Sequence, residues 1–290
     1  MAVDVRRATD HERDLRGQCG QVGPGPVKKN VLGVLVDATS YGEAVDTVLA
    51  AARARRTLAV TALAVHGVMT GVLDREHGAR LNSFDLVTPD GQPVRWALNL
   101  LHGSALTDPV CGPNLTWHVL RKAADEGLPV YLYGSTEQTL ERLMLNLQNT
   151  LPALKIAGHE ASKFRAARPG EDAEIAARIT ESGARIVLVG LGCPRQETFV
   201  HAMRPLLPMP LLAVGAAFDF HAGTLRRPPM WMRDHGLEWL WRLGLEPRRL
   251  WRRYLFLNPY YLLLLAAQWA GLRPAGPPSP ATSRPTVFPV

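Results

Sequence analysis

The sequence predicts an α/β fold in which a mostly parallel sheet carries helices on both faces and is followed by a helical C-terminal appendage. Short apolar runs alternate with segments whose apolar residues recur at helical spacing between residues 31 and 214. Repeated strand and helix units of this length imply parallel strands covered on both faces. The chain has 290 residues, of which 47% are hydrophobic, so it can bury a sizeable core.

The predicted elements follow one another in a Rossmann-like order, and no internal repeat interrupts them. Pro93 suits a first helical position, and Ser135 or Thr136 can cap the helix that follows them. Strands are predicted at residues 31–36, 58–63, 84–88, 128–133, 155–158, 185–189 and 211–214. Helices are predicted at residues 38–56, 65–82, 94–101, 112–126, 137–149 and 171–182.

Composition divides the chain into four parts and limits its partners. We expect a disordered lead without a signal peptide at residues 1–28, a catalytic core at 29–225, a helical appendage at 226–272 and a disordered tail at 273–290. The formal charge of +7 and the pI near 9.7 indicate an anionic partner: nucleic acid, a membrane surface or a phosphorylated substrate.

Cysteine usage favours a reducing cytoplasm. Cys19, Cys111 and Cys193 are odd in number, far apart and without C-x-x-C spacing. Neither a disulfide framework nor a zinc site is therefore predicted.

The appendage is rich in Trp, Arg and Leu. Its apolar run at residues 255–272 is interrupted by Asn258 and Pro259, whereas about 20 uninterrupted apolar residues are wanted for a membrane span. A helix lying in the membrane interface, with arginines near lipid phosphates, fits the pattern better. A packed terminal helix pair is the alternative.

Asp90 is the predicted catalytic base. It follows Pro89 and precedes Gly91 in a tight turn, after an apolar strand that begins at Phe84. This places its carboxylate at the carboxyl end of a strand, where open α/β sheets bind their ligands. The alternative is a turn aspartate that only hydrogen-bonds its own backbone.

Three glycine turns punctuate the core, at Gly112, at Gly134 and at residues 190–192, and glycine allows a phosphate or sugar to approach the backbone closely. None completes G-x-G-x-x-G or a Walker loop, because Arg195 stands where the third glycine would be. A dinucleotide cofactor is therefore poorly supported. Gln196 and Glu197 can hydrogen-bond a nucleotide base or ribose, or Glu197 can cap its helix.

These motifs resemble the WecG/TagA/CpsF family of glycosyltransferases over residues 30–254. Members move a sugar from a nucleotide diphosphate to a polyprenyl-diphosphate-linked acceptor. The resemblance rests on the segments Thr88-Pro89-Asp90-Gly91-x-Pro93, Val110-Cys111-Gly112-Pro113-Asn114-Leu115, Gly190-Leu191-Gly192-x-Pro194-Arg195-Gln196-Glu197, Gly215-Ala216-Ala217-Phe218-Asp219-Phe220 and Gly236-Leu237-Glu238-Trp239-Leu240-x-Arg242-Leu243 with Glu246-Pro247-x-Arg249.

The resemblance implies specific site residues. The family's base falls on Asp90, a strand threonine falls on Thr61, and the glutamine of its Pro-x-Gln-Glu motif falls on Gln196. The appendage arginines that complete the site correspond best to Arg242, Arg249 and Arg252. We expect substrate contacts at Gly91, Gly112, Asn114, Gly134, Gly190, Gly192, Gln196, Glu197 and Asp219.

The chain departs from the family at Ala64, where many members carry Asn; His66 could supply the hydrogen bond, or it packs at the start of a helix. No metal and no cofactor is predicted, because Asp-x-Asp is missing and His102, His118, His201, His221 and His235 show no ligand spacing. Cationic side chains must then neutralise the leaving group.

The sequence thus predicts a metal-independent, inverting glycosyltransferase of cell-surface polysaccharide biosynthesis. It would use a UDP-sugar donor and a polyprenyl-diphosphate-linked saccharide acceptor, and inversion is implied by the resemblance. We expect it in the cytoplasm, peripheral on the inner face of the cell membrane and bound to anionic lipid, with an oligomer left open. A nucleotide-sugar-binding regulator is one alternative. A nucleic-acid binder is less favoured, because the basic cluster is interleaved with Trp.

Overall fold

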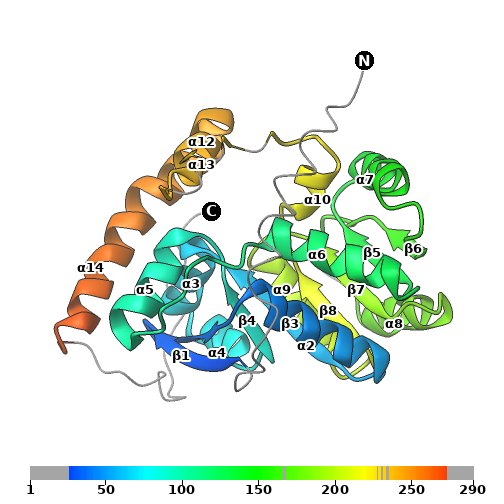
Figure 1. Cartoon of the computed structure of the whole chain (residues 1–290), viewed down its shortest axis with the longest axis horizontal. Coiled ribbons are helices and arrows are strands. Elements are labelled where there is room, and N and C mark those ends of the chain that lie inside the picture. Colours follow the sequence, from blue (N-terminus) through cyan, green and yellow to red (C-terminus); the bar gives the residue numbers. More distant parts are fainter. Residues whose placement is uncertain (1–25, 166–167, 227, 230, 233–234, 273–290) are drawn as a thin grey trace.

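The computed structural model describes residues 26–165, 168–226, 228–229, 231–232 and 235–272, and its central element is a parallel sheet (Figure 1). The predictions for residues 1–25 and 273–290 lie outside this part of the chain. The sheet has six strands in the order β4-β3-β8-β7-β5-β6. They are β3 (Leu58–Leu63), β4 (Leu86–Pro89), β5 (Val130–Gly134), β6 (Ile156–Glu160), β7 (Ile186–Gly190) and β8 (Pro210–Ala213).

Every pairing in this sheet is parallel, which confirms the predicted fold class. The central strands β7 and β8 are buried along their whole length. Such continuous apolar runs are typical of parallel strands covered on both faces.

Two apolar clusters lie on opposite faces of the sheet. One is built with α2 (Tyr41–Arg53), α6 (Gly112–Asp125), α7 (Glu137–Thr150) and α10 (Ala217–His221). The other is built with α3 (Val65–Leu73), α4 (Arg75–Asn82), α5 (Gln92–His102), α8 (Glu171–Glu181) and α9 (Arg195–Met203). Neighbouring residues of β3 divide between the clusters, with Ala59 in one and Val60 in the other, as the alternation of side chains along a strand requires.

Local capping decides where several helices begin. Ser40 and Glu43 form a reciprocal capping box at the start of α2, and Thr136 caps α7 through the Thr139 backbone N–H at 3.2 Å. The single helix predicted at residues 65–82 is wrong: the side chain of Asp74 accepts a hydrogen bond from the His77 backbone N–H and starts α4 as a separate helix.

The first predicted strand, at residues 31–36, is also wrong. The structure has a hairpin instead, with β1 (Val27–Val31) antiparallel to β2 (Val34–Ala38) in a separate two-stranded sheet. Leu32 and Gly33 form its turn with φ of 59° and 99°. A two-residue turn with positive φ at both positions matches the twist of paired strands, so Gly33 ends a strand that the apolar run appeared to continue.

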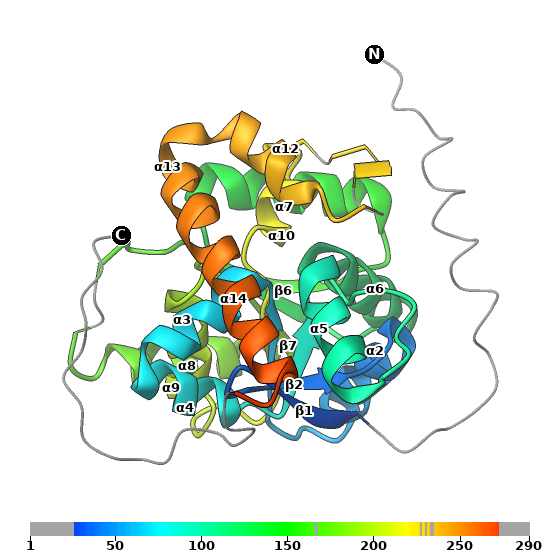
Figure 2. The same ribbon diagram turned by 90° about the vertical axis from the view of Figure 1, so that its left-hand side faces the viewer.

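The appendage runs along one side of the core (Figures 1 and 2). It comprises α12 (Glu238–Leu245), α13 (Pro247–Arg252), the π-helix η2 (Arg253–Leu257) and α14 (Asn258–Trp269). Helix α14 packs against α3 and α5, where the Tyr261 hydroxyl donates to the Pro93 carbonyl at 3.1 Å. The Gln268 side chain accepts from the Leu32 N–H at 2.8 Å and donates to the Asn30 carbonyl at 3.2 Å.

The other face of this helix is open to solvent. Tyr261 and Leu265 are buried, whereas Leu262, Leu263 and Trp269 of α14 are largely exposed, as are Leu255 and Phe256 of the preceding η2. Within the described residues, no helix is both long and apolar enough to span a bilayer. The segment is therefore packed on one face and apolar on the other.

Candidate active site

Asp90 lies at the carboxyl edge of the sheet, directly after β4. Strands β3 and β4 end side by side, with Leu63 opposite Pro89, and the Asp90 backbone N–H donates to the Leu63 carbonyl at 3.1 Å. Gly91 then takes a φ of 81°, a left-handed value suited to glycine, and α5 begins at the next residue. The turn therefore has the strand–turn–helix form that the sequence predicts.

The N-terminus of α6 holds the Asp90 carboxylate. The Val110 N–H donates to Pro89 at 2.9 Å, which places Cys111 and Gly112 beside Asp90. The Gly112 backbone N–H and the Cys111 thiol both donate to the carboxylate. A Cβ on Gly112 would lie 3.3 Å from the Val214 carbonyl oxygen, so glycine permits this close approach. The carboxylate thus bonds the start of another helix as well as sitting in its own turn.

Charged side chains of the appendage change the pKa of the Asp90 carboxyl. The approach to α12 packs on α5, since a Cβ on Gly236 would lie 3.1 Å from Trp96. Burial first, and then the negative charge of Glu238, raise the pKa of Asp90 to about 6, against the lowering effects of Cys111, Gly112 and Arg242. A carboxylate with a pKa near 6 is suited to accept a proton near neutral pH.

Glu238 and Tyr41 were not predicted as site residues. Glu238 is the second acid that acts on Asp90, although the two are far apart in the sequence. The Tyr41 hydroxyl accepts a hydrogen bond from the Cys111 backbone N–H at 2.9 Å and contacts the Asn114 side chain. Tertiary packing brings both to the edge, and no local spacing signals either.

Thr61, Gln196 and Glu197 form a second, buried cluster at the same edge. Glu197 Oε1 accepts from the Thr61 hydroxyl at 3.0 Å and from Gln196 Nε2 at 2.9 Å. Gln196 Oε1 accepts from the Gly192 backbone N–H at 3.2 Å. Burial raises the pKa of Glu197, although these hydrogen bonds oppose the rise. The cluster links β3, the turn after β7 and α9, and its predicted contact with substrate stays a prediction.

Close packing accounts for two of the glycines predicted to contact substrate. A Cβ on Gly134 would lie 2.7 Å from the Gly190 carbonyl oxygen, and a Cβ on Gly190 would lie 2.6 Å from the Phe218 ring. Gly192 takes a φ of 77° with open space around its Cβ direction. Of these three, Gly192 is the one that packing alone does not explain.

The remaining predicted residues lie in the appendage and after β8. Arg242 is half-buried, and its Nε atom has no hydrogen-bond partner within the described residues. Asp219 lies on α10, where the Thr224 hydroxyl approaches its carboxylate at 3.4 Å. The side chains of Arg249 and Arg252 lie outside the described part of the structure.

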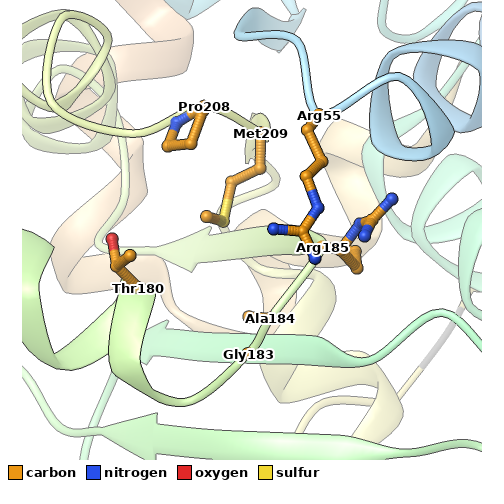
Figure 3. A pocket seen from close by; sticks show the side chains of 7 residues that line it. All are labelled: Arg55, Thr180, Gly183, Ala184, Arg185, Pro208 and Met209. Atoms are coloured by element: carbon orange, nitrogen blue, oxygen red, sulfur yellow. The ribbon is translucent and has the colours of Figure 1, made fainter.

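A pocket at the opposite edge of the sheet is not part of this site. Arg55, Arg185 and Met209, which line it, precede β3, β7 and β8, so it faces the amino ends of the strands (Figure 3). Arg185 has a structural role, because its guanidinium donates to the Ala52 and Arg53 carbonyls at the end of α2.

A family match shows that this fold is that of a glycosyltransferase. The model of the Glycosyl transferase WecG/TagA/CpsF family matches residues 29–275, and the chain belongs to this family, as the sequence predicts.

Two curated relatives are N-acetylglucosaminyldiphosphoundecaprenol N-acetyl-beta-D-mannosaminyltransferases. The protein from Bacillus spizizenii (strain ATCC 23059 / NRRL B-14472 / W23) is 31% identical over 197 residues, which cover 68% of this chain and 74% of the relative. The protein from Bacillus subtilis (strain 168) is 29% identical over 195 residues, covering 67% and 73%. The predicted enzyme class is therefore confirmed.

Proposed function

We propose that this glycosyltransferase moves a sugar from a UDP-sugar to a polyprenyl-diphosphate-linked saccharide, with inversion, in the synthesis of a cell-surface polysaccharide. The observation that carries the proposal is Asp90, which lies at the carboxyl edge of the sheet with a pKa raised to about 6. The relatives' names, which specify a lipid-diphosphate acceptor, support the acceptor class.

The proposed chemistry is one in-line displacement. Asp90 accepts the proton of the acceptor hydroxyl as that oxygen bonds to the anomeric carbon of the donor sugar. The bond between this carbon and the diphosphate oxygen breaks at the same time, and uridine diphosphate leaves with the electron pair. The Cys111 thiol and the Gly112 N–H orient the carboxylate, because both donate to it.

Arg242 is the described cation that suits the departing diphosphate. It lies near enough to Asp90 for its charge to lower the pKa of that carboxyl, and its Nε atom is unpartnered. A guanidinium placed where negative charge develops stabilises the transition state. We assign the same role to Arg249 and Arg252 from the family resemblance.

The exposed face of α14 suits a lipid-linked acceptor. Its outer leucines and aromatic residues can enter a bilayer interface, and the exposed Arg248 of the appendage can approach anionic headgroups. We propose that the enzyme acts peripherally at the inner face of the cell membrane, facing the cytoplasm.

The test is an assay of the purified full chain with a panel of nucleotide sugars and a short-chain, water-soluble lipid diphosphate saccharide. Transfer from one or more UDP-sugars, with an anomeric configuration opposite to that of the donor, is the expected result. Transfer only from sugars carried on another nucleotide would contradict the donor class, and retained configuration would contradict the single displacement.

A further inference from the structure

Three side chains from three segments meet behind the turn that follows β7. They are His77 on α4, Cys193 in the turn itself and Glu197 on α9. One nitrogen, one sulfur and one oxygen of the three all lie within 4.8 Å of one another, and this is the group of metal-ligand type found within the described residues. No sequence spacing connects His77 with the other two.

His77 contributes a buried, neutral imidazole to this cluster. Its side chain is 1% exposed, and its Nε2 atom has no hydrogen-bond partner in the part of the chain that the structure describes. Arg80 Nη1 lies 3.1 Å from Nδ1, and because a guanidinium can only donate, Nδ1 is the acceptor. Burial first, and then the charge of Arg80, lower the pKa of His77 to about 4, so the ring is neutral at physiological pH. Because Nδ1 accepts from Arg80, the proton of the neutral ring sits on Nε2, and it must move to Nδ1 before Nε2 can bind a cation.

Glu197 contributes a buried carboxylate to the same cluster. Its side chain is 0% exposed. Oε1 accepts from Thr61 and Gln196, and the Cys193 thiol hydrogen-bonds the carboxylate, while Oε2 has no further partner within the described residues. A buried polar atom without a partner is uncommon in a native fold and asks for an explanation. Here two such atoms, His77 Nε2 and Glu197 Oε2, belong to residues that meet the Cys193 thiol in one cluster.

We propose that His77 Nε2, Cys193 Sγ and Glu197 Oε2 form a three-ligand site for a zinc-class divalent cation, with a fourth position left for water. Nitrogen, thiolate and carboxylate are the ligand types that zinc takes, whereas magnesium and calcium prefer oxygen alone. Donors around a tetrahedral zinc lie roughly 3.3 to 3.8 Å apart, so loading would require atoms separated by up to 4.8 Å to approach by about 1 Å. The thiol proton leaves to solvent as the cation binds.

A bound cation would stiffen the edge of the sheet. It would tie α4 to the turn after β7 and to α9, and it would hold Glu197 in the orientation that bonds Thr61 and Gln196. This site is structural, and it does not depend on the proposed transfer reaction.

Substitution of Arg80, which contacts the His77 ring, provides a specific test of the proposed site. A cation on Nε2 leaves the imidazole proton on Nδ1, where Arg80 now donates, so loading must displace this guanidinium. Arg80→Gln supplies an amide oxygen that can accept from Nδ1–H. Second-shell partners of this kind change metal affinity about 10- to 100-fold, so we expect Arg80→Gln to bind more tightly by up to that factor. The exposed Arg75→Gln is the matched control.

The experiment is a titration with cobalt(II), which reports zinc-type sites by absorption. It uses the full chain with Cys19→Ser and Cys111→Ser, so that Cys193 is the last of the three cysteines. We expect one cobalt per chain, with a thiolate-to-cobalt charge-transfer band and tetrahedral visible bands. Zinc should displace the cobalt and bleach both.

Substitutions then assign the ligands. Cys193→Ser should remove the charge-transfer band, and His77→Gln and Glu197→Gln, which keep side-chain volume, should weaken binding at least tenfold while circular dichroism shows the fold intact. A chain that binds no cobalt, as when water alone bridges His77 and Glu197, would overturn the proposal. The proposal is also overturned if Cys193→Ser leaves the charge-transfer band unchanged, because the cation would then bind elsewhere.

Discussion

Asp90 and Glu197 are two carboxylates at one edge of the same sheet, and burial raises the pKa of both. Asp90 is half-buried, and charged groups of the appendage act on it. Glu197 is fully buried, and neutral donors of Thr61 and Gln196 surround it. A raised pKa alone therefore does not mark a catalytic acid or base. Access to a reacting proton separates the two residues, and the predictions below test that separation.

The largest effect is expected for Asp90→Asn. Loss of the base should lower turnover by about 10²- to 10⁴-fold, because general-base catalysis contributes that much, with little change in nucleotide affinity. Turnover is measured with a soluble acceptor, and affinity by calorimetry with uridine diphosphate. Asp108→Asn is the control, since Asp108 is exposed in the segment between α5 and α6. Wild-type turnover in a folded Asp90→Asn enzyme would remove Asp90 from the mechanism.

Glu197→Ala should instead act on stability. It leaves the Thr61 hydroxyl and the Gln196 amide buried without their acceptor, and each such group costs about 1 to 3 kcal/mol. We therefore expect the free energy of unfolding, measured in urea, to fall by about 2 to 6 kcal/mol. Glu141→Ala on the exposed face of α7 is the control. An unchanged urea midpoint would mean that the buried cluster contributes nothing to the fold.

Features with a local sequence signal were predictable, whereas contacts between distant segments were not. Strand β3 was predicted with its observed bounds and β7 to within one residue, because an apolar run between turns is a local signal. The position of Asp90 was predictable for the same reason. The charge of Glu238 on Asp90, the Tyr41 contact and the approach of His77 to Glu197 depend on tertiary packing of distant segments. The hairpin turn at Leu32 was missed because a single glycine inside an apolar run is a weak signal.

A smaller effect is expected on the pH dependence of kcat/KM, where substitutions of Glu238 and Arg242 should shift the acid limb in opposite directions. The base must be deprotonated, so kcat/KM should rise with pH through about 6, the pKa of Asp90 in the free enzyme. Glu238 raises this pKa and Arg242 lowers it. Glu238→Gln should therefore shift the acid limb to lower pH, and Arg242→Gln should shift it to higher pH. Parallel profiles with a soluble acceptor measure both, and limbs that move in the same direction would contradict the placement of α12 over Asp90.

The smallest effect on chemistry is expected on the outer face of α14. Truncation before α14 is a poor test, because Tyr261, Leu265 and Gln268 pack on the core and their loss would expose it. Leu262→Asn with Leu263→Asn changes two exposed side chains and leaves the packed face intact. Burying a leucine side chain contributes about 1.5 to 3 kcal/mol, so sedimentation with anionic vesicles should weaken by at least tenfold.

Transfer to a water-soluble acceptor should stay near the wild-type rate in this double variant, because both leucine side chains are exposed and the packed face of α14 is unchanged. The matched control is Leu145→Asn with Val27→Asn, two exposed apolar residues outside the appendage, and it should sediment like the wild type. Unchanged sedimentation of the Leu262 and Leu263 variant would show that α14 is only a packed helix. Loss of soluble transfer would show instead that this face contributes to the site, and the separation of anchor from catalysis would fail.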